Sequence, residues 1–190
     1  NEQSASQLLV EVRPDGETVG YANCVDARDN RYRSIAVDGA GNKWVGSFDG
    51  TGLLAFNERG TVDRADDLCQ GVRSANTQLP DNVITVLTID RVGQLWIGTA
   101  RGVAVIAGPG GVTNSSIPFV RRITAITSIL VNDIYVDALN NKWVATVGGV
   151  FVLNPDGTEV LAEITQSNAP LLDANIRSTA VDDLTGAAYF

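Results

Sequence analysis

The sequence contains no histidine and no methionine, and it has only two cysteines in 190 residues. Without histidine the chain has no Ser–His or Cys–His nucleophilic site and no imidazole ligand for a metal. Apolar residues make up 44 % of the chain. They form no run near the roughly 20 residues that a membrane-spanning helix needs. These absences exclude histidine-based catalysis, histidine-based metal centres and a helical membrane span within the sequence.

Positive charge is also scarce. Fourteen lysines and arginines face 22 aspartates and glutamates, which gives a net charge of −8. A nucleic-acid partner would require a basic face, so this balance argues against nucleic acid. Acidic loops on a soluble surface explain the excess, and the length fits a single array without a second domain. Because the chain begins with Asn and lacks Met, we expect it to be processed or excised.

One pattern of residues occurs four times. Alternating apolar residues lead to an aspartate, a turn of four or five residues follows, and an aromatic residue comes next. The aspartates are Asp38, Asp90, Asp137 and Asp182, and the aromatics are Trp44, Trp96, Trp143 and Tyr189. Short strands repeated with a period of roughly 40–50 residues are typical of a β-propeller, in which each repeat is one blade.

The strands of one blade can be assigned from the pattern. Apolar residues alternate before the aspartate, as expected of a strand with one face in a packed layer. Gly and Asn in the turn favour a hairpin to the tryptophan strand. A glycine then begins a third strand at 102–106 and at 149–153, and the turn 154–157 leads to an outer strand at 158–163. This predicts four antiparallel strands per blade and no helix.

The two ends of the chain continue the same pattern. Residues 9–19 match 150–160, with Pro14-Asp15-Gly16 aligned on Pro155-Asp156-Gly157. We therefore predict an all-β fold of about four blade-equivalents, forming an open arc that is part of a larger propeller. The expected units are an outer half-blade at 1–30, whole blades at 31–80, 81–130 and 131–173, and an inner half-blade at 174–190.

The residues that could carry chemistry have simpler structural explanations. No D-x-D-x-D-G calcium spacing occurs, and an aspartate before a hairpin turn usually caps that turn. The glycines at 108–111 lack the Lys-Ser/Thr of a phosphate loop. We predict no catalytic, cofactor-binding or metal site. Structural roles are assigned to turn aspartates and to tryptophans packed between blades, namely Asp38, Asp90, Asp137, Trp44, Trp96 and Trp143.

The two cysteines precede the first and second whole repeats. Equivalent loops of neighbouring blades emerge on the same face, so a disulfide between Cys24 and Cys69 is geometrically possible. Two unpaired thiols remain the alternative. Export to an oxidising compartment would favour the bridge.

Two stretches resemble known families. Residues 83–103, V-x-x-L-x-x-D-x-x-G-x-L-W-I-G-T-x-x-G-V, resemble the two-component regulator propeller repeat of periplasmic sensor domains. Residues 142–190 resemble the last blades of PorZ-type proteins, surface components of the type IX secretion system of Bacteroidetes. That second resemblance implies two propellers and a β-sandwich outside the outer membrane, which help to hand cargo to a sortase and engage anionic lipopolysaccharide. The chain has no such sandwich.

These observations favour a non-catalytic, extracytoplasmic binding or scaffold module, in the periplasm or at the outer-membrane surface. The expected setting is a type IX secretion or cell-surface assembly. The expected partners are other protein domains or further propeller blades, with a glycan or lipopolysaccharide as a further ligand class. The alternative is the ligand-sensing periplasmic propeller of a hybrid two-component regulator. A propeller lyase or hydrolase is disfavoured by the lack of histidine and of a clustered acid motif.

Overall fold

The computed structural model describes residues 7–22, 31–61 and 64–190. Within these ranges the chain is built of β-strands, apart from two single-turn 3₁₀ helices, η1 (Arg64–Asp66) and η2 (Pro109–Gly111). No helix in this described part is long and apolar enough to cross a membrane. The all-β class predicted from the repeats is confirmed.

Three consecutive four-stranded antiparallel sheets form the body of the molecule. In each, the strands lie side by side in chain order, which is the connectivity of a propeller blade. The first sheet contains β3 (Tyr32–Val37), β4 (Lys43–Ser47), β5 (Leu53–Asn57) and β6 (Leu68–Val72). The second contains β7 (Ile84–Ile89), β8 (Leu95–Thr99), β9 (Gly102–Ile106) and β10 (Val120–Thr127). The third contains β11 (Val131–Val136), β12 (Lys142–Thr146), β13 (Gly149–Leu153) and β14 (Val160–Ile164).

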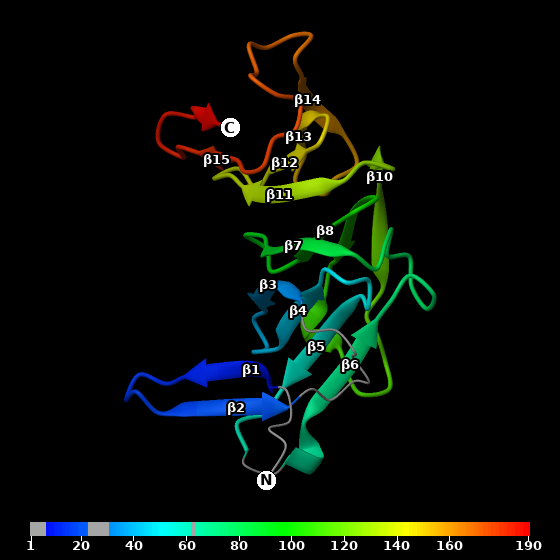
Figure 1. Cartoon of the computed structure of the whole chain (residues 1–190), viewed down its shortest axis with the longest axis vertical. Coiled ribbons are helices and arrows are strands. Elements are labelled where there is room, and N and C mark those ends of the chain that lie inside the picture. The colour runs from blue at the N-terminus through cyan, green and yellow to red at the C-terminus, as the bar shows by residue number, and fades with distance from the viewer. Residues whose placement is uncertain (1–6, 23–30, 62–63) are drawn as a thin grey trace.

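A two-stranded sheet flanks this body at each end. β1 (Gln7–Val12) pairs with β2 (Thr18–Ala22), and β15 (Ala180–Val181) pairs with β16 (Ala188–Tyr189). The two small sheets lie at opposite ends of the long axis (Figure 1). Among the described residues β1 and β16 do not pair, so the blades form an open arc, as predicted.

The sheets stack face to face through two apolar layers. The first strands of successive blades, β3, β7 and β11, contact one another. One buried cluster lies between the first and second sheets and contains Trp44, and another lies between the second and third and contains Trp96. Burial of apolar area between blades is the main stabilising contribution in such an array.

The glycine that begins the third strand is required by its backbone. Gly102 and Gly149 have φ of 122° and 130°, a region that side-chain-bearing residues rarely adopt. A Cβ atom at Gly149 would lie 2.3 Å from the carbonyl oxygen of Ile164. The tight connection between second and third strands therefore depends on this glycine.

The fourth strand of the third blade begins later than the sequence pattern suggests. β14 starts at Val160, two residues after the predicted start at 158. The side-chain oxygen of Asn154 accepts hydrogen bonds from the N–H groups of Thr158 (2.9 Å) and Glu159 (3.1 Å). These bonds keep both residues in the turn.

Candidate functional site

The repeated aspartate joins the first hairpin of each blade to its tryptophan. In three blades one carboxylate oxygen, Oδ1, accepts the backbone N–H groups two and four residues later, at 2.8–3.1 Å. The other oxygen, Oδ2, accepts the indole N–H six residues later. The pairs are Asp38–Trp44 at 2.9 Å, Asp90–Trp96 at 3.0 Å and Asp137–Trp143 at 3.0 Å.

The carboxylates of Asp38, Asp90 and Asp137 are buried, and both oxygens of each accept hydrogen bonds from the protein. A buried charge is tolerated only when its lone pairs are satisfied, and each carboxylate accepts at least four hydrogen bonds. Burial raises the pKa of Asp137, but the hydrogen bonds from Trp143 and Asn141 outweigh it and hold the pKa below its ordinary value. Asp137 is thus ionised at neutral pH, and all three carboxylates act as acceptors inside the fold.

The tryptophans differ in burial. Trp44 and Trp96 are fully buried between whole sheets. Trp143 occupies the equivalent place on β12 but is only partly buried, because the neighbouring sheet on its far side consists of β15 and β16 alone. The ring of Phe190 lies against it, with the centroids 6.2 Å apart.

The fourth position after the aspartate distinguishes the middle blade from its neighbours. Asn42 and Asn141 donate their side-chain amides to Oδ2 of Asp38 and Asp137, at 2.8 and 3.0 Å. The middle blade has Gln94 at this position, and its buried side-chain oxygen has no hydrogen-bond partner. Asp90 therefore lacks an amide from its own turn, and the side-chain amide of Asn140, from the next blade, donates to its Oδ2 at 3.4 Å.

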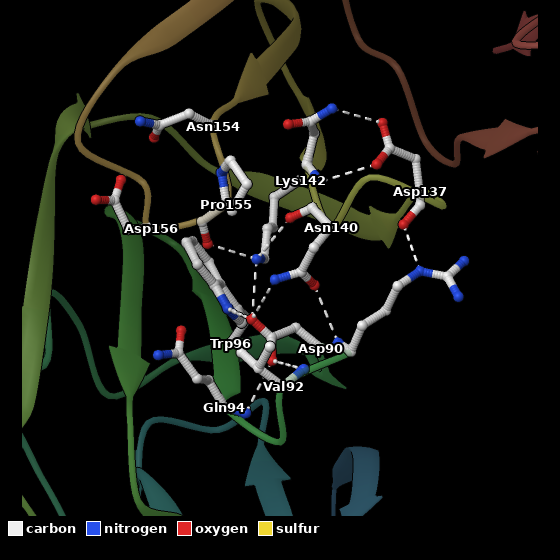
Figure 2. Close-up of polar contacts among 12 residues, drawn as sticks. Asp90, Val92, Gln94, Trp96, Asp137, Asn140, Lys142, Asn154, Pro155 and Asp156 are labelled. Atoms are coloured by element: carbon white, nitrogen blue, oxygen red, sulfur yellow. Dashed lines mark hydrogen bonds and ion pairs between the residues drawn. The ribbon is translucent and has the colours of Figure 1, made fainter.

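A lysine from the next blade also reaches this oxygen of Asp90, at a shorter distance than the amide of Asn140 (Figure 2). The side chain of Lys142 is completely buried, and its ammonium lies 2.9 Å from Oδ2 of Asp90. It also donates to the carbonyl oxygens of Asn140 (2.7 Å) and Pro155 (2.6 Å) and lies 4.5 Å from the centre of the Trp96 ring. All three ammonium protons have an acceptor, and the charge also meets an aromatic face.

Lys142 and Asp90 form an ion pair whose two side chains are both fully buried. Burial lowers the pKa of Lys142, although the hydrogen bond to Asp90 opposes that shift. Burial also raises the pKa of Asp90, but the hydrogen bonds from Lys142, Gln94 and Trp96 bring it below its ordinary value. The pair ties the second blade to the third, with each charge compensated by the other.

Lys142 was not identified from the sequence. Two signals were present: Gln instead of Asn four residues after the aspartate, and Lys five residues after the aspartate of the following repeat. The corresponding position in the middle repeat is Leu95, which faces the blade whose aspartate already has the amide of Asn42. The remaining equivalent, Lys43, forms an ion pair with Glu58 of its own blade.

Among the described residues, the aspartate of the fourth repeat, Asp182, accepts hydrogen bonds only from its own turn. Oδ1 of Asp182 accepts the N–H of Leu184 at 2.9 Å, and Oδ2 accepts the hydroxyl of Thr185 at 2.8 Å. The hydroxyl of Thr185 lowers the pKa of Asp182. No tryptophan joins this turn, and Tyr189 lies exposed. Asp182 therefore caps a turn without an inter-blade role.

The described residues contain no group of three or more His, Cys, Asp or Glu side chains placed to hold a metal ion. The repeated carboxylates are occupied by backbone, indole and amide donors, which leaves them no free oxygen for a substrate. Their hydrogen bonds hold the first hairpin of each blade to its tryptophan, which makes the blade rigid. The absence of catalytic and cofactor sites remains a prediction.

Two surface hollows are candidate binding places. One of about 490 Å³ adjoins the C-terminal small sheet, and its lining includes Leu171, Leu172, Arg177 and Phe190. The other, of about 480 Å³, lies between the segments 75–78 and 117–120, where Phe119 is exposed. Propellers commonly bind through such loop surfaces.

Of the two cysteines, Cys69 lies on β6 and is disulfide-bonded. Cys24, the other cysteine of the sequence, lies outside the described residues. The pairing between them therefore stays a prediction.

Comparison with family models places a two component regulator propeller repeat at residues 78–101. This segment spans the first hairpin of the middle blade and contains Asp90 and Trp96. No match was found in the comparison with curated protein sequences.

Among solved structures, the chain is similar to PorZ, an essential bacterial surface component of the type IX secretion system of Porphyromonas gingivalis. The match has 28 % identity and a TM-score of 0.74 and covers 89 % of this chain and 26 % of that chain. The chain thus spans about a quarter of the length of PorZ.

Two further groups of structures share the fold. The extracellular domain of the putative hybrid two component system BT3049 from B. thetaiotaomicron matches with 19 % identity and a TM-score of 0.64, over 91 % of this chain and 22 % of that chain. Virginiamycin B lyase from Staphylococcus aureus matches with 13 % identity and a TM-score of 0.62, over 90 % of this chain and 51 % of that chain. At these identities the likeness shows the propeller fold alone.

Proposed function

We propose that this chain is a non-catalytic, extracytoplasmic binding and scaffold module of a type IX secretion or related cell-surface assembly. The observation that carries the proposal is the similarity to PorZ. At 28 % identity over 89 % of this chain, it is higher than the 19 % found for the regulator domain. Similarity to either of these proteins supports the more general function of a propeller binding module.

The burial and hydrogen bonding of the repeated aspartates support a scaffold function. Enzymes keep catalytic carboxylates accessible in a cleft, with a pKa matched to their task. Here Asp38, Asp90 and Asp137 are buried, and their oxygens accept hydrogen bonds from the protein itself. Such groups stabilise blade contacts and have no access to a substrate.

An extracytoplasmic location is part of the proposal. Disulfides persist in oxidising compartments, and Cys69 is disulfide-bonded. The similar structures include a bacterial surface component and the extracellular domain of a two component system. Both observations support the periplasm or the outer-membrane surface.

The proposed partner is a protein domain. With a net charge of −8, the chain would repel an anionic glycan or lipopolysaccharide unless a local basic patch compensated. Lipopolysaccharide is therefore the less favoured ligand class, and other domains of the same assembly are the favoured one.

A graft into PorZ tests the proposal. In P. gingivalis, the stretch of PorZ that matches this chain is replaced by residues 1–190, and the amount of type IX cargo at the cell surface is measured. The control graft is the matching stretch of BT3049, which has the same fold. We expect secretion with the first graft and none with the control. A folded, surface-located first graft that restores no secretion would contradict the proposal.

The alternative, a ligand-sensing propeller of a hybrid two-component regulator, is favoured by the match at residues 78–101. The reciprocal graft into BT3049 tests it. If that chimera responds to a ligand and the PorZ graft stays inactive, the sensing function replaces the secretion function.

A further inference from the structure

The acidic residues of the chain are unevenly distributed. Residues 91–132 contain four arginines and no aspartate or glutamate, in a protein with 22 acidic residues and a net charge of −8. Residues 68–80 also lack acids and contain Arg73. The structure brings these two stretches together, because residues 75–78 and 117–120 line one hollow of about 480 Å³. An otherwise acidic protein therefore has an acid-free surface around this hollow.

The hollow rests on the apolar core between the first and second blades. It lies between the connection from β6 to β7 and the connection from β9 to β10. Val120, in its lining, and Leu79, which follows the segment 75–78, are buried in the same apolar cluster as Trp44. Its volume is within the range of about 300–1,000 Å³ that is usual for ligand sites.

Side chains of the β6–β7 connection hold its conformation from within. The side-chain oxygen of Asn76 accepts the backbone N–H of Arg73 at 2.9 Å. The hydroxyl of Thr77 donates to the carbonyl oxygen of Arg73 at 2.7 Å and accepts the N–H of Leu79 at 3.2 Å. These bonds need no partner molecule, so this wall of the hollow is formed before anything binds.

Two side-chain amides at the hollow keep hydrogen-bonding capacity. In the described part of the chain, the amide nitrogen of Asn76 and both polar atoms of the Gln78 side chain have no hydrogen-bond partner. Both residues are exposed. A side-chain amide carries a donor and an acceptor, as a peptide group does. The pair is therefore complementary to the backbone of an extended segment.

The opposite wall is apolar and ends in an exposed aromatic ring. Ile117 and Pro118 are partly buried, and Phe119 is 69 % exposed. One exposed apolar residue is common on a protein surface. Here, however, the ring borders a hollow whose other wall offers unpaired amides. Aromatic residues are enriched in protein interfaces because they bury a large area, so this ring is suited to contact an apolar side chain.

Two arginines beside the hollow have no acidic partner. Arg122 is exposed and reaches the carbonyl oxygen of Leu79 at 3.5 Å, and Arg73 is exposed and donates to the carbonyl oxygen of Thr51 at 3.0 Å. Within the described ranges neither guanidinium forms an ion pair. Four other arginines do, in the pairs Arg13–Glu17, Arg31–Asp49, Arg91–Asp183 and Arg101–Asp81. Unpaired guanidinium groups attract carboxylates.

We propose that this hollow docks an extended, acidic segment of a partner protein. One apolar side chain of the segment packs against Phe119, and its peptide groups bond the amides of Asn76 and Gln78. A carboxylate of the segment pairs with Arg122. The inference rests on the proposed function as a protein-binding module and identifies the surface that it uses.

An acidic protein segment fits this surface better than an anionic glycan does. The lining residues themselves carry no charge, and only the guanidinium groups beside them are positive. A glycan would satisfy the arginines, but it has no apolar side chain for the wall formed by Phe119. Elsewhere the net charge of −8 would repel an acidic partner, so the acid-free surface is the place where such a partner can approach.

Selection from a phage-displayed library of random peptides on the immobilised 190-residue chain tests the proposal. The enriched peptides should combine an excess of Asp and Glu with one recurrent large apolar residue. The affinity of the most enriched peptide is then measured by fluorescence anisotropy. Phe119→Ala and Arg122→Glu should each weaken binding about tenfold, since one removes the apolar contact and the other reverses the charge. Both side chains are exposed, so the unfolding midpoint should not change.

Matched controls make the same kinds of change at the other hollow. Leu172→Ala and Arg177→Glu alter exposed residues of its lining and should leave the peptide affinity unchanged. A selection that enriches no peptide, or peptides without an acidic excess, would overturn the proposal. An affinity that is unchanged by either Phe119→Ala or Arg122→Glu would overturn it too. Purified lipopolysaccharide is the last probe: binding that is lost in Arg122→Glu and kept in Phe119→Ala would assign the surface to an anionic glycan instead.

The graft into PorZ separates this inference from the proposed function. With residues 1–190 in place, the additional change Phe119→Ala should lower the amount of cargo at the cell surface. Equal secretion by both grafts would leave the secretion function standing and overturn the docking surface. Peptide binding as predicted, together with a graft that does not secrete, would support the docking surface and contradict the secretion function.

Discussion

At the scale of single residues, the aspartate of each repeat does more than close a turn. Its second oxygen holds the tryptophan, and the donor that completes its coordination comes from one of two sources. Asp38 and Asp137 receive an asparagine amide of their own turn, whereas Asp90 receives the ammonium of Lys142 and, at 3.4 Å, the amide of Asn140, both from the next blade. As hydrogen-bond donors to one buried carboxylate oxygen the amide and the ammonium are equivalent, although only the ammonium also carries a compensating charge.

This equivalence predicts a compensated double substitution. Lys142→Leu alone leaves the Asp90 charge buried without a cation, and we expect a loss of about 3–5 kcal/mol in the free energy of unfolding. The additional substitution Gln94→Asn recreates the arrangement between the first two blades, where Asn42 supplies the amide and Leu95 stands at the position of Lys142. It should restore most of the lost free energy of unfolding. Urea unfolding of the wild type, both single variants and the double variant measures the coupling. Purely additive effects would show that the amide and the ammonium do not substitute for each other.

At the scale of elements, the hairpins should be sensitive to acid. The pKa values of Asp90 and Asp137 are held below the ordinary 3.8 in the folded chain, so these groups bind protons less readily than in the unfolded chain. Their contribution is present above the unfolded pKa and is lost as the pH falls through the folded pKa. The urea midpoint should stay constant from pH 7 to about 5 and fall below about pH 4. The variant Asp137→Asn should show a shallower fall, and an unchanged wild-type midpoint at about pH 3 would contradict this account.

The connection between second and third strands is a separate test. Gly149→Ala forces a side chain into a positive-φ position against a backbone oxygen, and we expect a loss of more than about 2 kcal/mol. Gly39→Ala is the control, because Gly39 lies exposed in the Asp38 turn and its added Cβ would meet nothing within 4 Å. Thermal unfolding of the two variants should separate them by several degrees. Equal midpoints would show that the chain relaxes around residue 149.

Much of the element level could be predicted from the sequence. Period-two patterning, the Asp turns and the leading glycines specify strands locally, so β7, β8 and β9 can be assigned from residues within one repeat. The start of β14 was misjudged because the side chain of Asn154 extends the turn. Lys142 was missed because its partner Asp90 lies in a different blade, a contact that no local period shows. The partial exposure of Trp143 depends on the size of the neighbouring β15–β16 sheet, which the pattern within one repeat does not specify.

At the scale of the whole molecule, the cysteines give a prediction about cross-linking. If Cys69 is bridged to Cys24, a loop of about 45 residues is closed, which is worth roughly 4 kcal/mol in the chain-entropy model. The purified chain should contain no free thiol, and peptide mapping without reduction should recover the two cysteines in one linked fragment. Reduction should lower the unfolding midpoint. A linkage between two copies through Cys69 would contradict the intramolecular bridge.

In the stack of blades shown in Figure 1, the three four-stranded sheets lie between the two small end sheets. Binding modules of this kind gain precision from the rigid layers and specificity from loops and edges. The carboxylates and tryptophans of the repeats are hydrogen-bonded and packed within the blades, whereas the exposed apolar residues lie both on the end sheets and on the strands and loops of the whole blades.

The most direct test of the account is hydrogen exchange at the three indole N–H groups, monitored by NMR. If each aspartate holds its tryptophan between blades, the indoles of Trp44 and Trp96 should exchange only through global unfolding, and that of Trp143 should exchange faster. Replacing Asp90 by Ala should remove the protection of Trp96 more than that of Trp44. Three indoles exchanging at the rate of a free peptide would contradict the blade structure and the Asp–Trp contacts on which this account depends.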